Sequence, residues 1–84
     1  MNRVLPDDGF AATARDYARR VAEGPTAAHA ATKRLIVTAV RDGVRAADDA
    51  VSAVSGALFA TADLRDAVAS FLREGPGKAI FQGR

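Results

Sequence analysis

The chain has 84 residues, no cysteine and a single histidine, and its 12 basic and 10 acidic residues leave a net charge of +2. Because these charges are interspersed, the composition offers no basic patch, and we expect no nucleic-acid partner. The longest wholly apolar run, residues 57–60, is far below the ~20 residues that cross a membrane. We therefore expect a cytoplasmic chain without a membrane segment.

A chain of this length has difficulty in building a self-sufficient core. Small domains bury only about 60% of the surface that their unfolded chains expose. Without cysteine, and with one histidine, neither disulfides nor a metal centre can compensate, so we expect no metal ligands and no resident cofactor. Much of the 49% hydrophobic content is alanine, which fills little volume. We expect a partner chain to complete the core.

The first half of the chain carries the pattern of two helices. Residues 2–6 are expected to be extended, because a proline biases the residue before it away from the helical region. Apolar residues at helical spacing then predict a helix near residues 8–23, which a Gly-Pro pair ends. A second helix is predicted near residues 26–42, beginning at a threonine that can cap it and ending before Gly43.

The second half continues in the same way. Small and β-branched side chains at steps of three and four predict a helix near residues 44–60. A last helix near residues 62–74 begins after a capping threonine, and its apolar face is expected to bury Phe71. Residues 75–84 form a tail that begins Gly-Pro-Gly. Strand-like alternation is absent from the sequence, so we predict an all-α fold of three to four helices in a single domain, residues 1–84.

Few side chains have the arrangement that chemistry needs. Catalysis by histidine normally needs a carboxylate that orients the ring and a nucleophile held against it. The sequence indicates neither for His29, so its simplest role is structural. Asp48 and Asp49 lie about 100° apart on a helix and therefore diverge. Lys33 is a candidate phosphate contact, with ordinary surface charge as the alternative. We predict no catalytic residue.

Four short motifs, in this order, resemble one known protein segment. They are Asn-Arg-Val-Leu-Pro at residues 2–6, Gly-Pro-Thr at 24–26, Thr-Lys-Arg-Leu-Ile at 32–36 and Phe-Gln-Gly-Arg at 81–84. Over residues 2–84 the chain resembles the C-terminal helical segment of the enoyl-CoA hydratase/isomerase (crotonase) superfamily. In that family the catalytic carboxylates and the oxyanion-binding N–H groups lie on an α/β core that precedes this segment. The resemblance therefore implies that the present chain corresponds to the helical segment alone, without that core.

The resemblance also implies candidate contacts with an acyl-CoA thioester. In that family an aromatic residue of the last helix lines the acyl pocket and a basic residue follows it, and Phe71 matches the aromatic position. Glu74 stands where the basic residue is usual, with Arg73 before it and Lys78 after it. Phe81 matches the aromatic residue of the family's C-terminal ending. The candidate substrate-binding residues are therefore Phe71, Arg73, Lys78 and Phe81.

Three functions follow as hypotheses. The first is a role in oligomer assembly, as in crotonase-like trimers, with a further role in covering an acyl-CoA site and no catalysis by the chain itself. The second is complementation of a separately encoded crotonase-type catalytic chain, so that the two together hydrate or isomerise an enoyl-CoA. The third is a self-contained helical binding module. The expected partners are accordingly further copies of this chain or a crotonase-type catalytic chain, with acyl-CoA as a candidate ligand.

Overall fold

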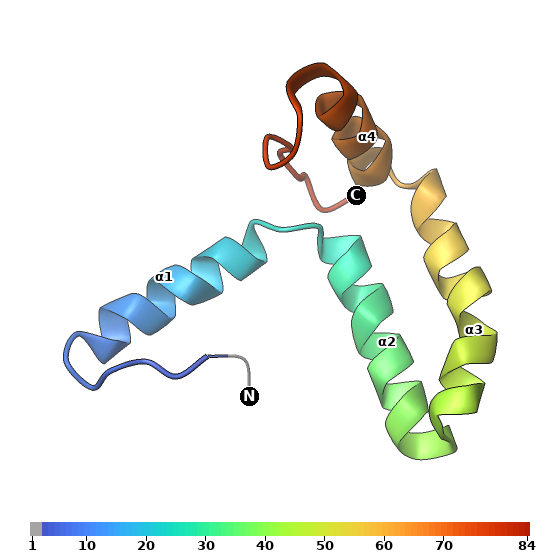
Figure 1. The fold of residues 1–84 in the computed structure, drawn as a ribbon, viewed down its shortest axis with the longest axis horizontal. Helices are drawn as coiled ribbons and strands as arrows, with labels where there is room; N and C mark the ends of the chain where they lie inside the picture. Colours follow the sequence, from blue (N-terminus) through green and yellow to red (C-terminus); the bar gives the residue numbers. More distant parts are fainter. Residues whose placement is uncertain (1–2) are drawn as a thin grey trace.

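The computed structural model describes residues 3–84, and all regular secondary structure in that range is helical (Figure 1). The elements are α1 (Phe10–Ala22), α2 (Thr26–Asp42), α3 (Val44–Gly56), the short 3-10 helix η1 (Ala57–Ala60) and α4 (Ala62–Glu74). The predicted all-α class with three to four helices is confirmed. The helix expected over 44–60 is α-helical only to Gly56 and then tightens into η1. Of the extended lead-in expected over 2–6, residue 2 lies outside the described residues, and residues 3–6 form neither helix nor strand.

The helices α2 and α3 form an antiparallel hairpin with a single residue between them. That residue, Gly43, has φ 95° and ψ 160°, a backbone conformation that residues other than glycine rarely adopt. Its N–H donates to the carbonyl of Ala39 at 3.0 Å and so closes the end of α2. Ala31 and Ala47, one on each helix, are buried. Their small side chains allow the two helices to approach closely.

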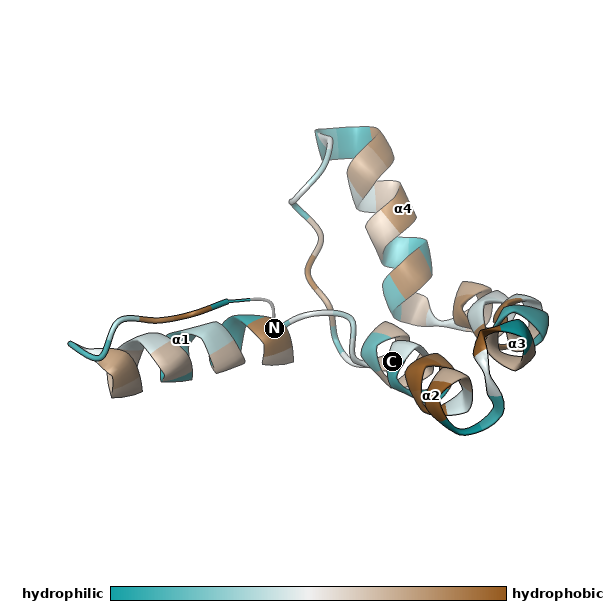
Figure 2. Ribbon diagram, turned by 60° about the horizontal axis from the view of Figure 1, so that its bottom comes forward, coloured by the Kyte–Doolittle hydropathy of each residue, from teal (hydrophilic) through white to brown (hydrophobic). Residues whose placement is uncertain are grey.

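The helix α4 is defined at both ends by local hydrogen bonds. At its start, the hydroxyl of Thr61 accepts from the N–H of Leu64 at 3.3 Å, which is the expected N-cap. At its end, Gly75 adopts φ 82° and donates its N–H to the carbonyl of Phe71 at 2.9 Å. The tail then turns back along α4 and returns to the region where α2 and α4 begin (Figure 2).

The helix α1 projects away from the other helices (Figure 1). Every residue in it remains at least partly exposed to solvent. Two contacts reach it. The guanidinium carbon of Arg3 lies 5.4 Å from the centre of the Tyr17 ring in the middle of the helix, and the Nε2 atom of His29 lies 3.2 Å from the carbonyl oxygen of Val21 near its end. His29 thus connects α2 with the end of α1, as the structural interpretation of this residue requires.

The chain exposes more surface than a compact monomer of its size. Its accessible area is 6746 Å², whereas a folded monomer of 8.7 kDa exposes about 4,700 Å². Its radius of gyration is 15.8 Å, against about 12 Å for a compact domain of 84 residues. The helices are therefore formed, but much of their apolar surface lacks a cover.

The predicted apolar face of α4 needs correction. The buried residues of this helix are Asp63 and Ser70, which lie on the side that the tail covers. Phe71 is 58% exposed and Leu72 is 79% exposed. The expectation that Phe71 is buried is therefore wrong within a single chain, because hydrogen bonds to Asp63 attach the tail to a different side of the helix.

None of the helices in residues 3–84 combines the length and the apolar character that crossing a bilayer demands.

Candidate functional site

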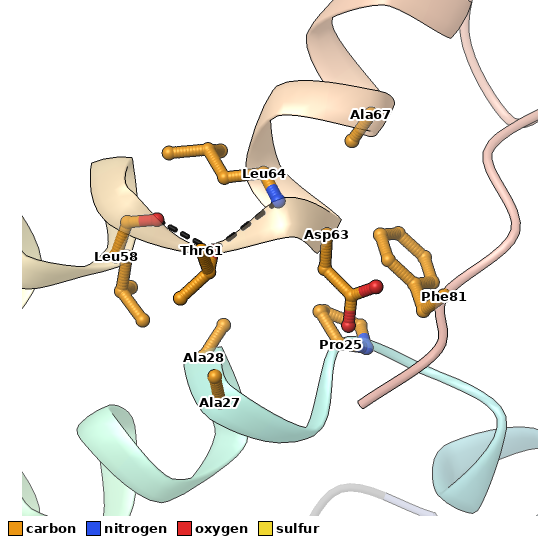
Figure 3. A pocket seen from close by; sticks show the side chains of 9 residues that line it. All are labelled: Pro25, Ala27, Ala28, Leu58, Thr61, Asp63, Leu64, Ala67 and Phe81. Carbon is orange, nitrogen blue, oxygen red and sulfur yellow. Dashed lines mark hydrogen bonds between the residues drawn. The ribbon is translucent and has the colours of Figure 1, made fainter. Parts of the chain in front are cut away.

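A pocket of about 250 Å³ lies where α2, η1, α4 and the tail meet (Figure 3). Its lining is Pro25, Ala27, Ala28, Leu58, Thr61, Asp63, Leu64, Ala67 and Phe81. The space exists because alanines occupy the facing positions of α2 and α4, while the two leucines and the Phe81 ring form larger apolar walls (Figure 3). Segments far apart in the sequence thus contribute to one cavity.

The hydroxyl of Thr61, one of the polar groups at the pocket, makes two hydrogen bonds within the chain. It donates to the carbonyl of Leu58 at 2.6 Å and accepts from the N–H of Leu64 at 3.3 Å (Figure 3). These bonds join the end of η1 to the first turn of α4. The hydroxyl therefore stabilises the wall of the pocket and has no hydrogen left to donate to a ligand.

The carboxylate of Asp63 holds the end of the tail. Its Oδ1 atom accepts from the N–H of Gln82 at 2.7 Å, and its Oδ2 atom accepts from the N–H groups of Gly83 at 2.8 Å and Arg84 at 3.2 Å. In return, the N–H of Asp63 donates to the backbone oxygen of Arg84 at 2.7 Å. We call this set of four hydrogen bonds the tail clamp. Because Phe81 directly precedes these residues, the clamp determines where its ring lies.

The electrostatics of the clamp favour the ionised form of Asp63. The N–H of Gln82 contributes most to lowering the pKa of this carboxyl, and the N–H groups of Gly83 and Arg84 and the charge of Arg84 act in the same direction. Burial opposes them, since Asp63 is only 3% exposed, but the net effect is a lowered pKa. At neutral pH the carboxylate is therefore charged, and the three hydrogen bonds that it accepts are charge-assisted.

The backbone of Gly83 makes the clamp possible. Its φ of 82° lies in the left-handed region, which glycine enters at no steric cost. Consecutive N–H groups around a left-handed residue can converge on one anion, and here the anion is a side chain of the same chain. A β-carbon at this position would lie 3.6 Å from the hydroxyl oxygen of Thr26, so the tail also adjoins the start of α2.

The residues predicted to bind substrate do not gather at one place. Phe81 lines the apolar pocket. Phe71 and Arg73 belong to the end of α4, where a guanidinium nitrogen of Arg73 lies 3.2 Å from a carboxylate oxygen of Glu74. Lys78 is an exposed residue of the tail. Glu74 is therefore paired with Arg73, one of the basic side chains that were expected to contact the substrate.

The predicted phosphate contact, Lys33, lies elsewhere. Together with Arg34, Val37 and Thr38 of α2 and Val54 of α3, it borders a second and more open depression of about 400 Å³. Its two cations are exposed, as expected of surface charge. The five predicted contact residues are therefore divided between the pocket, the end of α4, the tail and the α2–α3 depression.

Sequence reasoning missed the main role of Asp63. By its position in the first turn of α4, the carboxylate indicates no more than an interaction with the positive end of the helix dipole. Its hydrogen-bond partners lie 19 to 21 residues further along the chain and are backbone groups, which carry no side-chain signature. Within residues 3–84, no three histidine, aspartate or glutamate side chains come together as a metal site would need.

Comparisons with known proteins leave the family open. No family model, curated protein or solved structure matches the chain. The resemblance to the crotonase superfamily therefore depends on the sequence motifs and their order.

Proposed function

We propose that this chain is an assembly segment, similar to the C-terminal helical segment of enoyl-CoA hydratases and isomerases, and that it performs no catalysis by itself. The observation that carries the proposal is the exposed apolar surface of well-formed helices. The accessible area exceeds that of a compact monomer by roughly 2,000 Å². Stable interfaces between proteins bury about 1,200–2,000 Å² in total, so the excess is large enough to supply one chain's share.

Large apolar side chains are exposed on every helix. On α4 they include Phe71 and Leu72, and on α2 they include Ile36, Val37 and Val40, the last of which is 80% exposed. Contiguous apolar patches of this kind are rare on monomers and mark surfaces for other proteins. The sequence motifs favour either further copies of this chain or a crotonase-type catalytic chain as the covering surface.

The test is the mass of the purified chain at several concentrations, measured by light scattering and sedimentation equilibrium. We expect a dimer or trimer that dissociates on dilution, with a melting temperature that rises with protein concentration. A monodisperse monomer at high micromolar concentration, with a melting temperature independent of concentration, would refute self-assembly.

A second candidate function is complementation of a separate catalytic chain. The exposed ring of Phe71, at the position that matches the family's acyl-contacting aromatic residue, favours it. Coexpression with a crotonase-type catalytic part, followed by an assay of enoyl-CoA hydration, tests this function. A stable complex that raises the activity of the catalytic part supports it, whereas two chains that purify separately and an unchanged activity contradict it.

A further inference from the structure

Beyond assembly, we propose that the pocket between α2, η1, α4 and the tail is a binding site for a small, uncharged, apolar molecule. We further infer that Asp63 is a positioning residue for this site, because the tail clamp holds Phe81 as one of its walls. The proposal concerns a site separate from the exposed faces of α2 and α4, and it stands whether or not the chain self-assembles.

The chemistry of the lining selects against polar ligands. Thr61 and Asp63 are the residues of the lining whose side chains are polar, and their oxygens bond to groups of the chain itself. A ligand that carries a charge or a hydrogen-bonding group would lose its water there and find these side-chain oxygens already engaged, which disfavours its binding. An apolar ligand loses nothing of this kind and gains the burial of its surface.

The size of the pocket limits the ligand further. In another protein, a cavity of about 150 Å³ lined by apolar side chains remains dry and binds benzene or xenon. Sites for drug-sized ligands begin at about 300 Å³. The present pocket, at about 250 Å³, lies between these values. It therefore fits a single ring or a short hydrocarbon group.

The clamp makes the site dependent on one side chain. The ring of Phe81 faces the α4 wall near Asp63 (Figure 3), and the next residue, Gln82, gives the 2.7 Å hydrogen bond to Asp63. Without the carboxylate, three N–H groups of the tail lose their acceptor. The tail would then leave α4 and open the pocket on the Phe81 side, while the α2–α3 hairpin, which does not use Asp63, would remain.

The experiment is a titration of the isotope-labelled chain with benzene, in which NMR measures the chemical shifts of the backbone amides at each benzene concentration. We expect saturable shifts in the segments that line the pocket, around residues 25–28 and 61–67. Ala67→Leu fills the pocket and should weaken benzene binding at least tenfold. Ala69→Leu is the matched control, since it makes the same change on the same helix at an exposed position and should leave binding unchanged. Ala28→Leu fills the pocket from α2 and replaces Ala67→Leu if that variant does not fold.

The role of Asp63 is tested with Asp63→Asn, which preserves the size of the side chain and removes its charge. We expect weaker benzene binding together with faster hydrogen exchange at the amides of residues 82–84, while the helical circular dichroism and the exchange of the α2–α3 hairpin stay as in the original chain. Retained tail protection and unchanged benzene affinity in this variant would overturn the positioning role.

The ligand proposal is overturned if benzene gives no saturable shifts in the original chain, or if the pocket-filling variants bind it unchanged. Sedimentation of the same variants distinguishes the site from the assembly surface. One outcome is that Ala67→Leu and Ala28→Leu reduce self-association while the original chain binds no benzene. The pocket would then accept an apolar side chain of a second copy, and the ligand proposal would be overturned. Benzene binding by a chain that is monomeric throughout would support the pocket and refute self-assembly alone.

Discussion

Truncation of Phe71 to alanine should separate the stability of the single chain from the stability of its assembly. A fully covered phenylalanine buries about 200 Å². Since Phe71 is 58% exposed, roughly 85 Å² of that area is covered within one chain, which corresponds to about 2 kcal/mol. The remaining area, about 115 Å², corresponds to about 3 kcal/mol and becomes available only when another surface covers the ring.

Urea unfolding at low and high protein concentration, combined with sedimentation equilibrium, measures the two contributions. In dilute solution we expect Phe71→Ala to lower the free energy of unfolding by about 2 kcal/mol. In the same variant the association constant should fall by roughly two orders of magnitude for each covered ring, because 1.4 kcal/mol corresponds to a factor of ten. Arg65→Ala, a change at an exposed position of the same helix, should alter unfolding by no more than about 0.5 kcal/mol and serves as the control.

Two results would refute this reasoning. A loss of about 3–5 kcal/mol at every protein concentration is typical of a ring buried within one chain, and it would mean that α4 is rotated relative to the structure. An association constant that Phe71→Ala leaves unchanged would show that the interface does not include the end of α4.

The remaining predictions concern the helix ends, the clamp and catalysis. Thr61→Ala removes the N-cap of α4 and should lower the free energy of unfolding by about 1 kcal/mol, measured by urea denaturation. Gly43→Ala forces a β-carbon into a conformation that is almost exclusive to glycine, so it should cost about 1–3 kcal/mol in the same assay, and an unchanged midpoint would contradict the observed φ. Because the pKa of Asp63 is lowered in the folded chain, the clamp should be fully stabilising above the ordinary aspartate pKa of about 3.9 and be lost as the pH falls through the lower folded value. Hydrogen exchange at residues 82–84 as the pH is lowered from 5, after correction for the intrinsic pH dependence of exchange, reports this loss, and a loss of protection already centred above a pH of about 3.9 would contradict it. The purified chain should hydrate no enoyl-CoA, and saturable crotonyl-CoA hydration that disappears when one of its own carboxylates is changed would disprove this.

Local patterns were sufficient to predict the helices, although Thr26, which was expected to cap α2, is its first residue and makes no capping hydrogen bond. Apolar residues recur at steps of three and four, and the breaks between helices coincide with residues whose backbone preferences are strong. Gly43 and Gly75 both adopt positive φ, and Thr61 caps α4 through its own side chain. These features depend on neighbours within about four residues, so the sequence contains nearly all the information that they require.

The candidate site was predictable only in part. The sequence motifs singled out Phe81, which lines the pocket, but not the alanines that leave its space open. An alanine at helical spacing reads equally well as a core residue or as a neutral surface residue. Whether it faces a cavity depends on what the opposite helix presents, and that is a property of the packed chain.

The sequence by itself determined that the chain is helical, where its helices turn, and that its apolar surface exceeds what 84 residues can cover. Only the tertiary structure decided which side of α4 the tail covers, and hence that Asp63 and Ser70 are buried while Phe71 is exposed. The physical reason is that periodicity reports which residues of a helix are apolar and not what lies against them. The side was set by a carboxylate and three backbone N–H groups about 20 residues away, and backbone groups are the same in every sequence.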